Sequence, residues 1–235
     1  GANVSTSHLI SSSGVVADDT TGVGTERRDV GAASYGSDKA IFGYGISSSI
    51  VGMTNLVNNQ GVVSADVSAV GTNRRDIAAV GYGVDLAMFA YGNTGSKSNL
   101  KNLVTNQGVV GANVTGVGTA RGDLAASRYG VGLAIFGYGN TGSYVSMTNL
   151  VTNVGVVGSD VTGVGTVRRS LAACTFGVGK AIFGFGRDGS NELSVTNLVS
   201  DVGVVAADTT GVGTAREKLG ACSFGGDKGI FAFGV

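Results

Sequence analysis

The chain repeats one segment of about 47 residues along its whole length. Three unrelated markers recur at the same steps of 47, 47, 47 and 48 residues. They are a Gly-Val-Val triplet starting at Gly14, Gly61, Gly108, Gly155 and Gly203, an aromatic-small-aromatic motif starting at Phe42, Phe89, Phe136, Phe183 and Phe231, and the arginine of Gly-Thr-x-Arg at Arg27, Arg74, Arg121, Arg168 and Arg216. A shared register of this kind is typical of repeat architectures, so one structural unit recurs five times.

Each unit predicts four short β-strands. In the second unit, residues 76–82 are small and apolar, residues 86–91 alternate between two faces, and apolar runs follow at 100–104 and 108–114. Glycine-rich turns separate these runs at the spacing of all-β folds. No stretch keeps a 3.6-residue apolar period, so we expect almost no helix.

Four strands per repeat match the size of one propeller blade, whereas a β-solenoid coil is about half as long. The strand nearest the axis of a propeller has room only for small side chains. Every first strand carries such a pair, at Ala32-Ala33, Ala78-Ala79, Ala125-Ala126, Ala172-Ala173 and Gly220-Ala221. The sequence therefore predicts a single domain over residues 1–235, a five-bladed β-propeller with four antiparallel strands per blade. The solenoid is the weaker alternative.

The two ends of the chain are predicted to share the last blade. Residues 1–24 match the third and fourth strands of a unit, and residues 219–234 match the first and second strands. Pairing the two halves would remove the exposed edges of an open arc of sheets. We therefore expect closure, with the chain ends side by side.

Composition excludes several classes of protein. The chain is 43% hydrophobic and 14% charged, which suits a packed core. Its 16 basic and 16 acidic residues cancel, so it lacks the basic footprint of a nucleic-acid-binding protein. It has no run of 18 apolar residues and no signal-peptide pattern at residues 1–8. We expect a monomer that contacts neither nucleic acid nor membrane.

The first half of each unit resembles the kelch repeat. The segment from Arg168 to Ala173, followed by Lys180 to Gly186, has an arginine, a small apolar strand, a turn and an aliphatic-aromatic strand that ends in glycine. The chromosome-condensation-regulator repeat is similar over the same segment. The kelch tryptophan is missing, because the chain contains no tryptophan.

The whole unit, with Thr-Asn-Leu-Val and Thr-Gly-Val-Gly-Thr-x-Arg, is similar to repeats in structural proteins of marine bacteriophages. This resemblance implies a virion-associated or host-surface role, with the protein in the virion or in the cytoplasm of the producing cell. The leading interpretation is a non-enzymatic structural or binding propeller with a protein or glycan partner on its loop face. The alternative is a multivalent lectin that binds carbohydrate through the loops between strands 2 and 3. A glycoside-hydrolase propeller is the weakest hypothesis.

The repeated arginine is the sharpest candidate for a ligand-binding residue. Five guanidinium groups converging at the mouth of the channel could hold a phosphate, sulfate or carboxylate. The alternative is structural, with each arginine bound to a carboxylate or to loop carbonyls and tying blade to blade. Each arginine has a polar residue eight positions upstream, at Asp19, Asp66, Asn113, Asp160 and Asp208, and this cancellation of charge favours the structural alternative.

The loops after the second strand vary most, and loops held by a rigid frame commonly carry function. Asn93 and Asn140 begin polar Asn-Thr-Gly turns, and Tyr144 is the only aromatic residue in these loops. These three residues are the predicted surface contacts. The repeated Phe and Tyr residues could form sugar-stacking platforms, but such a stripe is more often core between blades.

No catalytic, metal or cofactor site is predicted. His8 stands where the other repeats have asparagine, and no partner for a zinc site or a Ser-His-Asp triad accompanies it. Asp38, Asp85 and Asp227 repeat as turn residues do. The two cysteines occupy equivalent places in successive repeats, at Cys174 and Cys222. They are interpreted as free thiols, with an inter-blade disulfide as the alternative.

Overall fold

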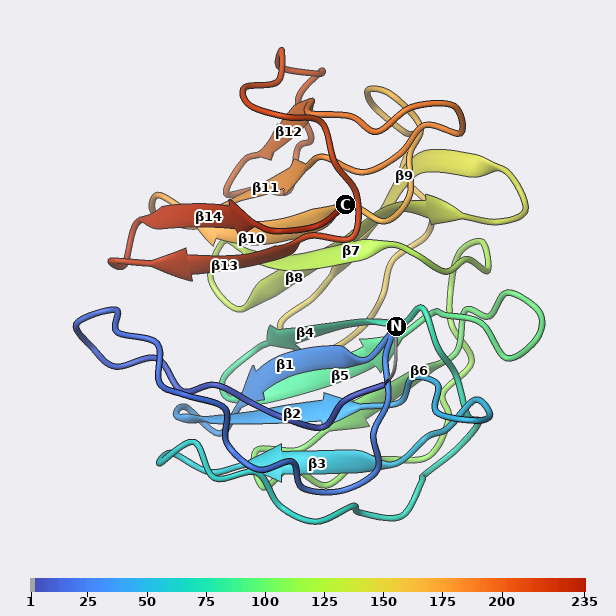
Figure 1. Cartoon of the computed structure of the whole chain (residues 1–235). Coiled ribbons are helices and arrows are strands. Elements are labelled where there is room, and N and C mark those ends of the chain that lie inside the picture. The colour runs from blue at the N-terminus through green and yellow to red at the C-terminus, as the bar shows by residue number, and fades with distance from the viewer. Residues whose placement is uncertain (1–2) are drawn as a thin grey trace.

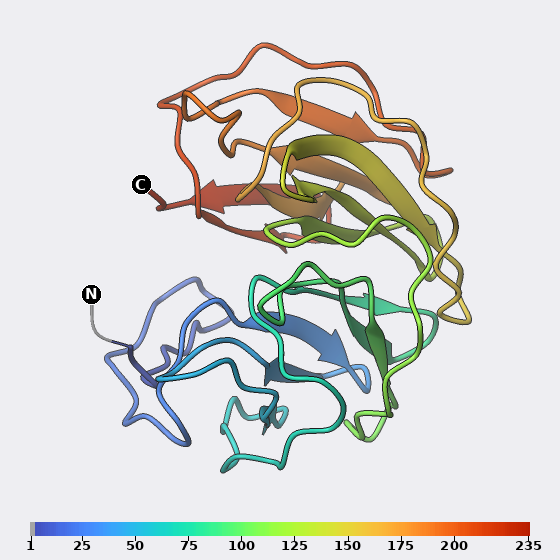
Figure 2. The same cartoon turned by 90° about the vertical axis from the view of Figure 1, so that its right-hand side faces the viewer.

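The computed structural model describes residues 3–235, which form fourteen β-strands and no helix. The strands group into five antiparallel sheets of two or three strands, one sheet for each repeat. The first strands contact one another in the order β1, β4, β7, β10 and β13. The sheets therefore succeed one another around a common centre, with the first strand of each innermost (Figures 1 and 2).

The all-β prediction is confirmed, and the strands follow the repeat. The first sheet contains β1 (Gly31–Tyr35), β2 (Lys39–Gly43) and β3 (Thr54–Val57), and the second contains β4 (Ala78–Tyr82), β5 (Leu86–Ala90) and β6 (Lys101–Val104). The third contains β7 (Ala125–Tyr129), β8 (Leu133–Asn140) and β9 (Tyr144–Val151), and the fourth contains β10 (Ala172–Phe176), β11 (Lys180–Gly184) and β12 (Thr196–Val199). The fifth contains only β13 (Gly220–Phe224) and β14 (Lys228–Ala232).

The predicted fourth strand is not a regular strand. In the first sheet it is reduced to two isolated bridges, Thr54 with Val67 and Val57 with Val63. Two residues lie between the bridges on β3 and three lie between them on the returning segment, so the extra residue forms a bulge that interrupts the ladder. The Asn55 amide donates to the Ser64 carbonyl at this point, 3.0 Å away. The prediction of four regular strands per blade was therefore wrong in detail, and the same pair of bridges recurs in the next three sheets.

Backbone hydrogen bonds join the inner strands at both ends. Where the first strands begin, Ser170 N donates to Asp123 O and Lys218 N to Ser170 O, both at 2.9 Å. At the opposite end, the turns between first and second strands are joined in the same way, for example Gly83 N to Gly132 O at 2.7 Å. Two of the three turn residues at 130–132 are glycine, with φ of 52° at Gly130 and 71° at Gly132, a region that glycine adopts without steric cost.

Aromatic side chains form the core between sheets, as the structural interpretation of the aromatic stripe predicted. Tyr44 packs against Phe89 of the next sheet, with ring centroids 5.0 Å apart, and both rings are fully buried. The same edge or tilted contact recurs between Tyr91 and Phe136, Tyr138 and Phe183, and Phe185 and Phe231. Each such pair adds to the apolar area that holds neighbouring sheets together.

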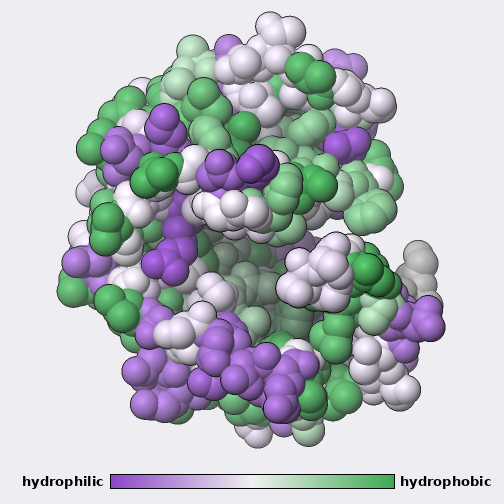
Figure 3. Space-filling view, turned by 90° about the vertical axis from the view of Figure 1, so that its left-hand side faces the viewer, coloured by the Kyte–Doolittle hydropathy of each residue, from purple (hydrophilic) through white to green (hydrophobic). Residues whose placement is uncertain are grey.

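The fifth sheet is incomplete. Within residues 3–235, β14 pairs with β13 alone, and Phe233 is 89% exposed. The predicted pairing of the chain ends in a shared sheet is not formed, because the two halves lie against opposite neighbours. Strands β13 and β14 pack on the fourth sheet, whereas residues 7–20 form a short hairpin that contacts the first sheet. Figure 3 shows a central hollow that opens to one edge of the molecule.

The hairpin of residues 7–20 has the geometry of the outer half of a complete sheet. Its bridges, Ser7 with Thr20 and Ile10 with Val16, are equivalent to those that follow β3. Leu9 lies beside Gly61 as its repeat equivalent, Leu56, lies beside Gly108. The described residues contain no helix that could cross a membrane.

A substitution at Gly155 would test how closely successive sheets approach each other. Its φ is 78°, and a Cβ built on it would lie 2.8 Å from the Tyr82 ring. We expect Gly155→Ala to destabilise the protein by roughly 1–3 kcal/mol through overpacking, beyond the backbone strain of about 1–2 kcal/mol. The control Gly142→Ala has φ of 118° and open space around its Cβ, so only strain applies. Equal losses for the two variants in urea-induced unfolding would contradict the close approach.

Candidate functional site

The five predicted arginines do not line a common opening. Arg74, Arg121 and Arg168 are fully buried between sheets. Each guanidinium lies over the aromatic ring of the preceding sheet. The distances from Cζ to the ring centroid are 4.8 Å for Arg74 over Tyr44, 4.3 Å for Arg121 over Tyr91, 4.0 Å for Arg168 over Tyr138 and 4.7 Å for Arg216 over Phe185. These contacts support the structural alternative of a residue that ties neighbouring sheets together.

The guanidinium groups of the first four of these arginines are hydrogen-bonded to their own sheets. Arg168 donates from Nε to the Phe185 carbonyl at 2.9 Å and from Nη2 to Asn197 Oδ1 at 2.7 Å. Its Nη1 donates to the Thr166 carbonyl at 3.1 Å. A buried charge is costly unless hydrogen bonds satisfy it, and these three bonds meet that requirement. The guanidinium therefore has no free edge for an external anion.

A carboxylate completes the cluster, but it is not the one predicted from sequence proximity. Arg121 Nη1 lies 3.7 Å from Asp160, which follows it by 39 residues and belongs to the same sheet. The aspartate eight residues upstream instead pairs with the preceding arginine, as in the contact of Arg27 with Asp66 at 3.6 Å. Arg74 has no carboxylate because Asn113 stands at that place, and Arg216 makes no ion pair among the described residues.

Tyr91 shows why the aromatic partner is often tyrosine. Burial raises the pKa of Tyr91 to about 12, although the charge of Arg121 opposes the shift. The hydroxyl therefore stays protonated and donates to the Val117 carbonyl at 3.3 Å. Tyr44 and Tyr138 make the equivalent bonds to Val70 and Val164. A ring, a guanidinium and a valine carbonyl thus form the same contact at successive interfaces.

The opening at the centre is lined instead by the residues that follow these arginines. We call it the axial mouth, a cavity of about 780 Å³ at the end where the first strands begin. Its apolar lining comes from one aliphatic side chain of each repeat, namely Val30, Ile77, Leu124, Leu171 and Leu219. Its charged lining consists of Arg28, Asp29, Arg75, Asp76, Lys97, Asp123, Arg169 and Lys218. Ser170 and two asparagines complete it.

The third repeat departs from the others at this mouth. Gly122 stands where Arg28, Arg75 and Arg169 occur in other repeats. The side chain of Lys97 reaches into the space that this glycine leaves, since its Nζ would lie 3.2 Å from a Cβ at residue 122. Lys97 Nζ also lies 3.5 Å from Asp123. A cation is therefore present at this part of the mouth although the arginine is not.

Carboxylates crowd one side of the axial mouth. Burial raises the pKa of Asp76, and the neighbouring Asp123 and Asp29 raise it further, against the opposing charges of Arg75 and Lys97. Asp123 is shared by two cations, with Arg169 Nη1 at 3.9 Å. The mouth therefore combines unlike charges in a partly buried setting, an arrangement found at binding sites as well as in structural networks.

The loop residues predicted as surface contacts gather near this mouth. Asn93 and Asn140 line it, whereas Tyr144 does not. The Tyr144 ring lies 5.3 Å from the Arg169 guanidinium, and its hydroxyl accepts a hydrogen bond from Arg169 Nε at 3.0 Å. Tyr144 therefore orients the side chain of Arg169, which lines the axial mouth.

Sequence reasoning missed the mouth residues themselves. It chose the arginine present in every repeat, while Arg28, Arg75 and Arg169 come one position later in the chain, where the residue varies. That variability was the available signal, because a contact required at each interface cannot change and a site at the centre can.

The remaining candidate residues occupy structural places. His8 Nε2 contacts Asp19, as Asn55 contacts Asp66 in the next repeat. Cys174 and Cys222 are free thiols, and burial together with the nearby Cys222 raises the pKa of Cys174 to about 11. Over residues 3–235, no group of three or more His, Cys, Asp or Glu side chains could hold a metal ion.

No protein-family model matches the chain, and a comparison with curated proteins finds no match. The resemblances to the kelch repeat and to the bacteriophage repeats therefore stay predictions.

The ionisation of Asp160 should make the free energy of unfolding depend on pH in the acid range. Burial pushes its pKa up, but hydrogen bonds from Thr119 and Asn149 and the charge of Arg121 outweigh this, so the pKa is lowered below 3.8. A lowered pKa contributes stability that is present above the unfolded value and is lost as pH falls through the folded value. We expect Asp160→Asn, which copies Asn113, to lose less unfolding free energy than the native chain between pH 5 and pH 2. A steeper loss in the variant would contradict this assignment.

Asp76 should behave in the opposite way. Because its pKa is raised by burial and by Asp123, its ionisation costs more in the folded state than in the unfolded chain. Asp76→Asn should therefore raise the unfolding midpoint at pH 7, and the gain should vanish as pH falls below the unfolded value of 3.8. Asp38→Asn, in an exposed turn, is the matched control and should leave the midpoint unchanged. A lower midpoint for Asp76→Asn at pH 7 would sink the interpretation.

Proposed function

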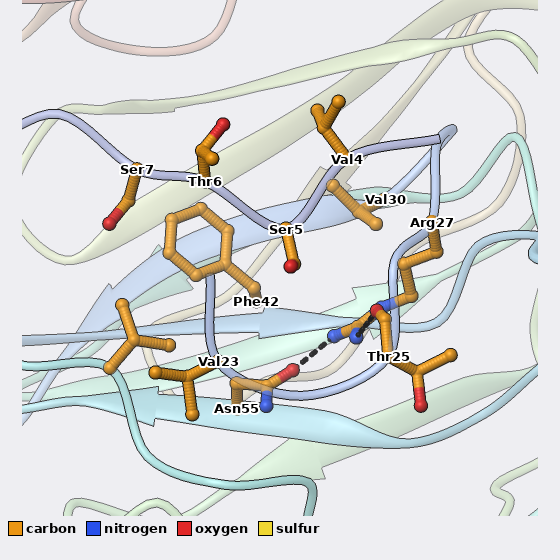
Figure 4. A pocket seen from close by; sticks show the side chains of 11 residues that line it. Val4, Ser5, Thr6, Ser7, Val23, Thr25, Arg27, Val30, Phe42 and Asn55 are labelled. Atoms are coloured by element: carbon orange, nitrogen blue, oxygen red, sulfur yellow. Dashed lines mark hydrogen bonds between the residues drawn. The ribbon is translucent and has the colours of Figure 1, made fainter. Parts of the chain in front are cut away.

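We propose that the chain is a five-bladed propeller whose fifth blade is completed by residues 7–20, and that it acts as a non-enzymatic binding scaffold. The observation that supports closure most strongly is a vacant aromatic slot on the first sheet. This slot is a cavity of about 240 Å³ whose lining includes Val23, Arg27 and Phe42 (Figure 4). A cavity of roughly 150 Å³ already accommodates benzene, so the slot has room for an aromatic ring.

Repeat equivalence identifies the occupant of the slot. At the next interface, Tyr44 packs on Phe89, lies beneath Arg74 and donates to the Val70 carbonyl. Phe42, Arg27 and Val23 are the equivalents of those three partners. The equivalent of Tyr44 in the preceding blade is Phe233, which is 89% exposed. The empty slot on the first sheet and the exposed ring of Phe233 would therefore fill one contact if the ring closed.

The same equivalence defines the pairing of the fifth blade. Strand β2 pairs with β3 through Ile41 with Leu56, Phe42 with Asn55 and Gly43 with Thr54. Carried to the last blade, Ile230 would face Leu9, Phe231 would face His8 and Ala232 would face Ser7. The pairing would cover the free edge of β14, and exposed strand edges are liable to unwanted association.

His8 is compatible with this closure. In the other blades an asparagine accepts a hydrogen bond from the arginine and donates one to the aspartate, as Asn197 does between Arg168 and Asp208. A neutral imidazole also has one acceptor and one donor nitrogen. With one nitrogen on Asp19, His8 would offer the other to Arg216.

The closed ring would serve as a rigid frame that presents the axial mouth and its loops. Rigid frames with variable loops are suited to binding, and nothing in this arrangement requires chemistry. The second candidate is the lectin, favoured by the two asparagine amides of Asn93 and Asn140 at the mouth. Since these loops converge on one cavity, such a lectin would have one central site in place of five separate ones.

Paired truncations test closure. Phe185 occupies the equivalent slot of the fifth sheet and is buried, so Phe185→Ala should cost roughly 3–5 kcal/mol. In the closed ring Phe233→Ala should cost a comparable amount, because its ring fills the slot of the first sheet. Denaturant-induced unfolding measures both. A loss for Phe185→Ala with no change for Phe233→Ala would show an open ring and overturn the proposal.

A further inference from the structure

The axial mouth concentrates positive charge in a chain whose formal net charge is zero. Five cationic and three anionic side chains line it, which leaves two net positive charges when all are ionised. Gathering like charges at one opening costs stability, and a bound anion would offset that cost.

Two of these cations have little internal compensation. Arg75 has its Nε buried with no hydrogen-bond partner, and its nearest carboxylate, Asp76, is 3.7 Å away. Lys218 makes no ion pair among the residues described. Lys97 and Arg169, in contrast, both lie within 4.0 Å of Asp123. Arg75 and Lys218 are therefore the charges best placed to serve a ligand.

The neutral groups of the mouth present donors as well. Asn93 Oδ1 accepts a hydrogen bond from Gly95 N, and Asn140 Oδ1 accepts one from Gly142 N, both at 2.8 Å. Each amide oxygen is thereby occupied by its own turn, which leaves the NH₂ group for the cavity. A site built from guanidinium, ammonium and amide donors is complementary to oxygen atoms that carry negative charge.

We propose that the axial mouth binds an oxyanion carried on a small organic body. Arg75 and Lys218 supply the charge, and Asn93 and Asn140 supply the neutral donors. The cavity of about 780 Å³ is far larger than a bare oxyanion and falls within the range of small-molecule sites, roughly 300–1,000 Å³. The five aliphatic side chains of its lining give the organic body an apolar surface. The proposal rests on the closed ring, because Lys218 comes from the last repeat and Arg28 from the first.

Calorimetric titration of the full chain distinguishes the contribution of the anionic group to affinity from that of the organic body. We expect glucose 6-phosphate to bind, inorganic phosphate to bind more weakly, and glucose to show no binding. Raising sodium chloride from 50 to 500 mM should weaken the binding of glucose 6-phosphate at least tenfold, since ionic contacts are screened by salt. If inorganic phosphate binds as tightly as glucose 6-phosphate, the ligand needs no organic body and that part of the proposal is wrong. If glucose binds as tightly as glucose 6-phosphate, the ligand needs no anionic group, and the lectin hypothesis is favoured.

Two variants test whether glucose 6-phosphate binds at the axial mouth. The double change Arg75→Gln with Lys218→Gln should lower the affinity for glucose 6-phosphate at least tenfold. Lys39→Gln removes one cation from the start of β2, at the opposite end of the first strands, and should leave affinity unchanged. No binding by the native chain, or binding that the double variant leaves intact, would overturn the mouth as an anion site.

The two proposals fail in different ways. If Phe233→Ala is as destabilising as Phe185→Ala but glucose 6-phosphate does not bind, the ring is closed and the ligand class is wrong. If Phe233→Ala has no effect on stability, the closed ring is wrong, whatever the titration shows.

Discussion

The first four sheets are joined, pair by pair, by a buried guanidinium that stacks on the aromatic ring of one sheet and is hydrogen-bonded to the backbone of the next. Arg121 illustrates both halves of the contact, with its Cζ 4.3 Å from the Tyr91 ring and its Nε 2.9 Å from the Tyr138 carbonyl. A buried charge tolerates few changes around it, because each lost partner leaves an uncompensated group. The recurrence of asparagine, aspartate and threonine around most of these arginines follows from this constraint.

The same constraint separates structure from function along the chain. Positions that every interface needs are constant, as at Arg74 and Arg121. The next position varies, and its arginines, such as Arg75, line the axial mouth, whereas Gly122 and Glu217 stand there in other repeats. In a repeat protein, the place where the copies differ at the axis is therefore more informative about binding than the place where they agree. The axial mouth is asymmetric for this reason, although the frame that holds it is regular.

Much of the fold could be predicted from the repeat, because alternating apolar residues and glycine turns determine strands locally. The five sheets, the absence of helix over residues 3–235 and the aromatic core were all accessible in this way. The bulge opposite Asn55 was not, because it depends on the amide of that residue reaching across to the Ser64 carbonyl. The partner of Arg27 was mistaken because Asp66 is distant in sequence and adjacent only after folding. The proposed closure would require Phe233 to reach the other end of the chain, a contact that no local pattern specifies.

The closed ring is the central claim, and it predicts one contact that an open arc lacks. Nuclear Overhauser effects between the ring protons of Phe233 and the methyl groups of Val23 measure that contact directly. The account predicts clear cross-peaks to Val23 and to the Phe42 ring, with the Phe233 ring shifted by its aromatic neighbour. Random-coil shifts for Phe233 and no cross-peaks to residues of the first sheet would contradict it.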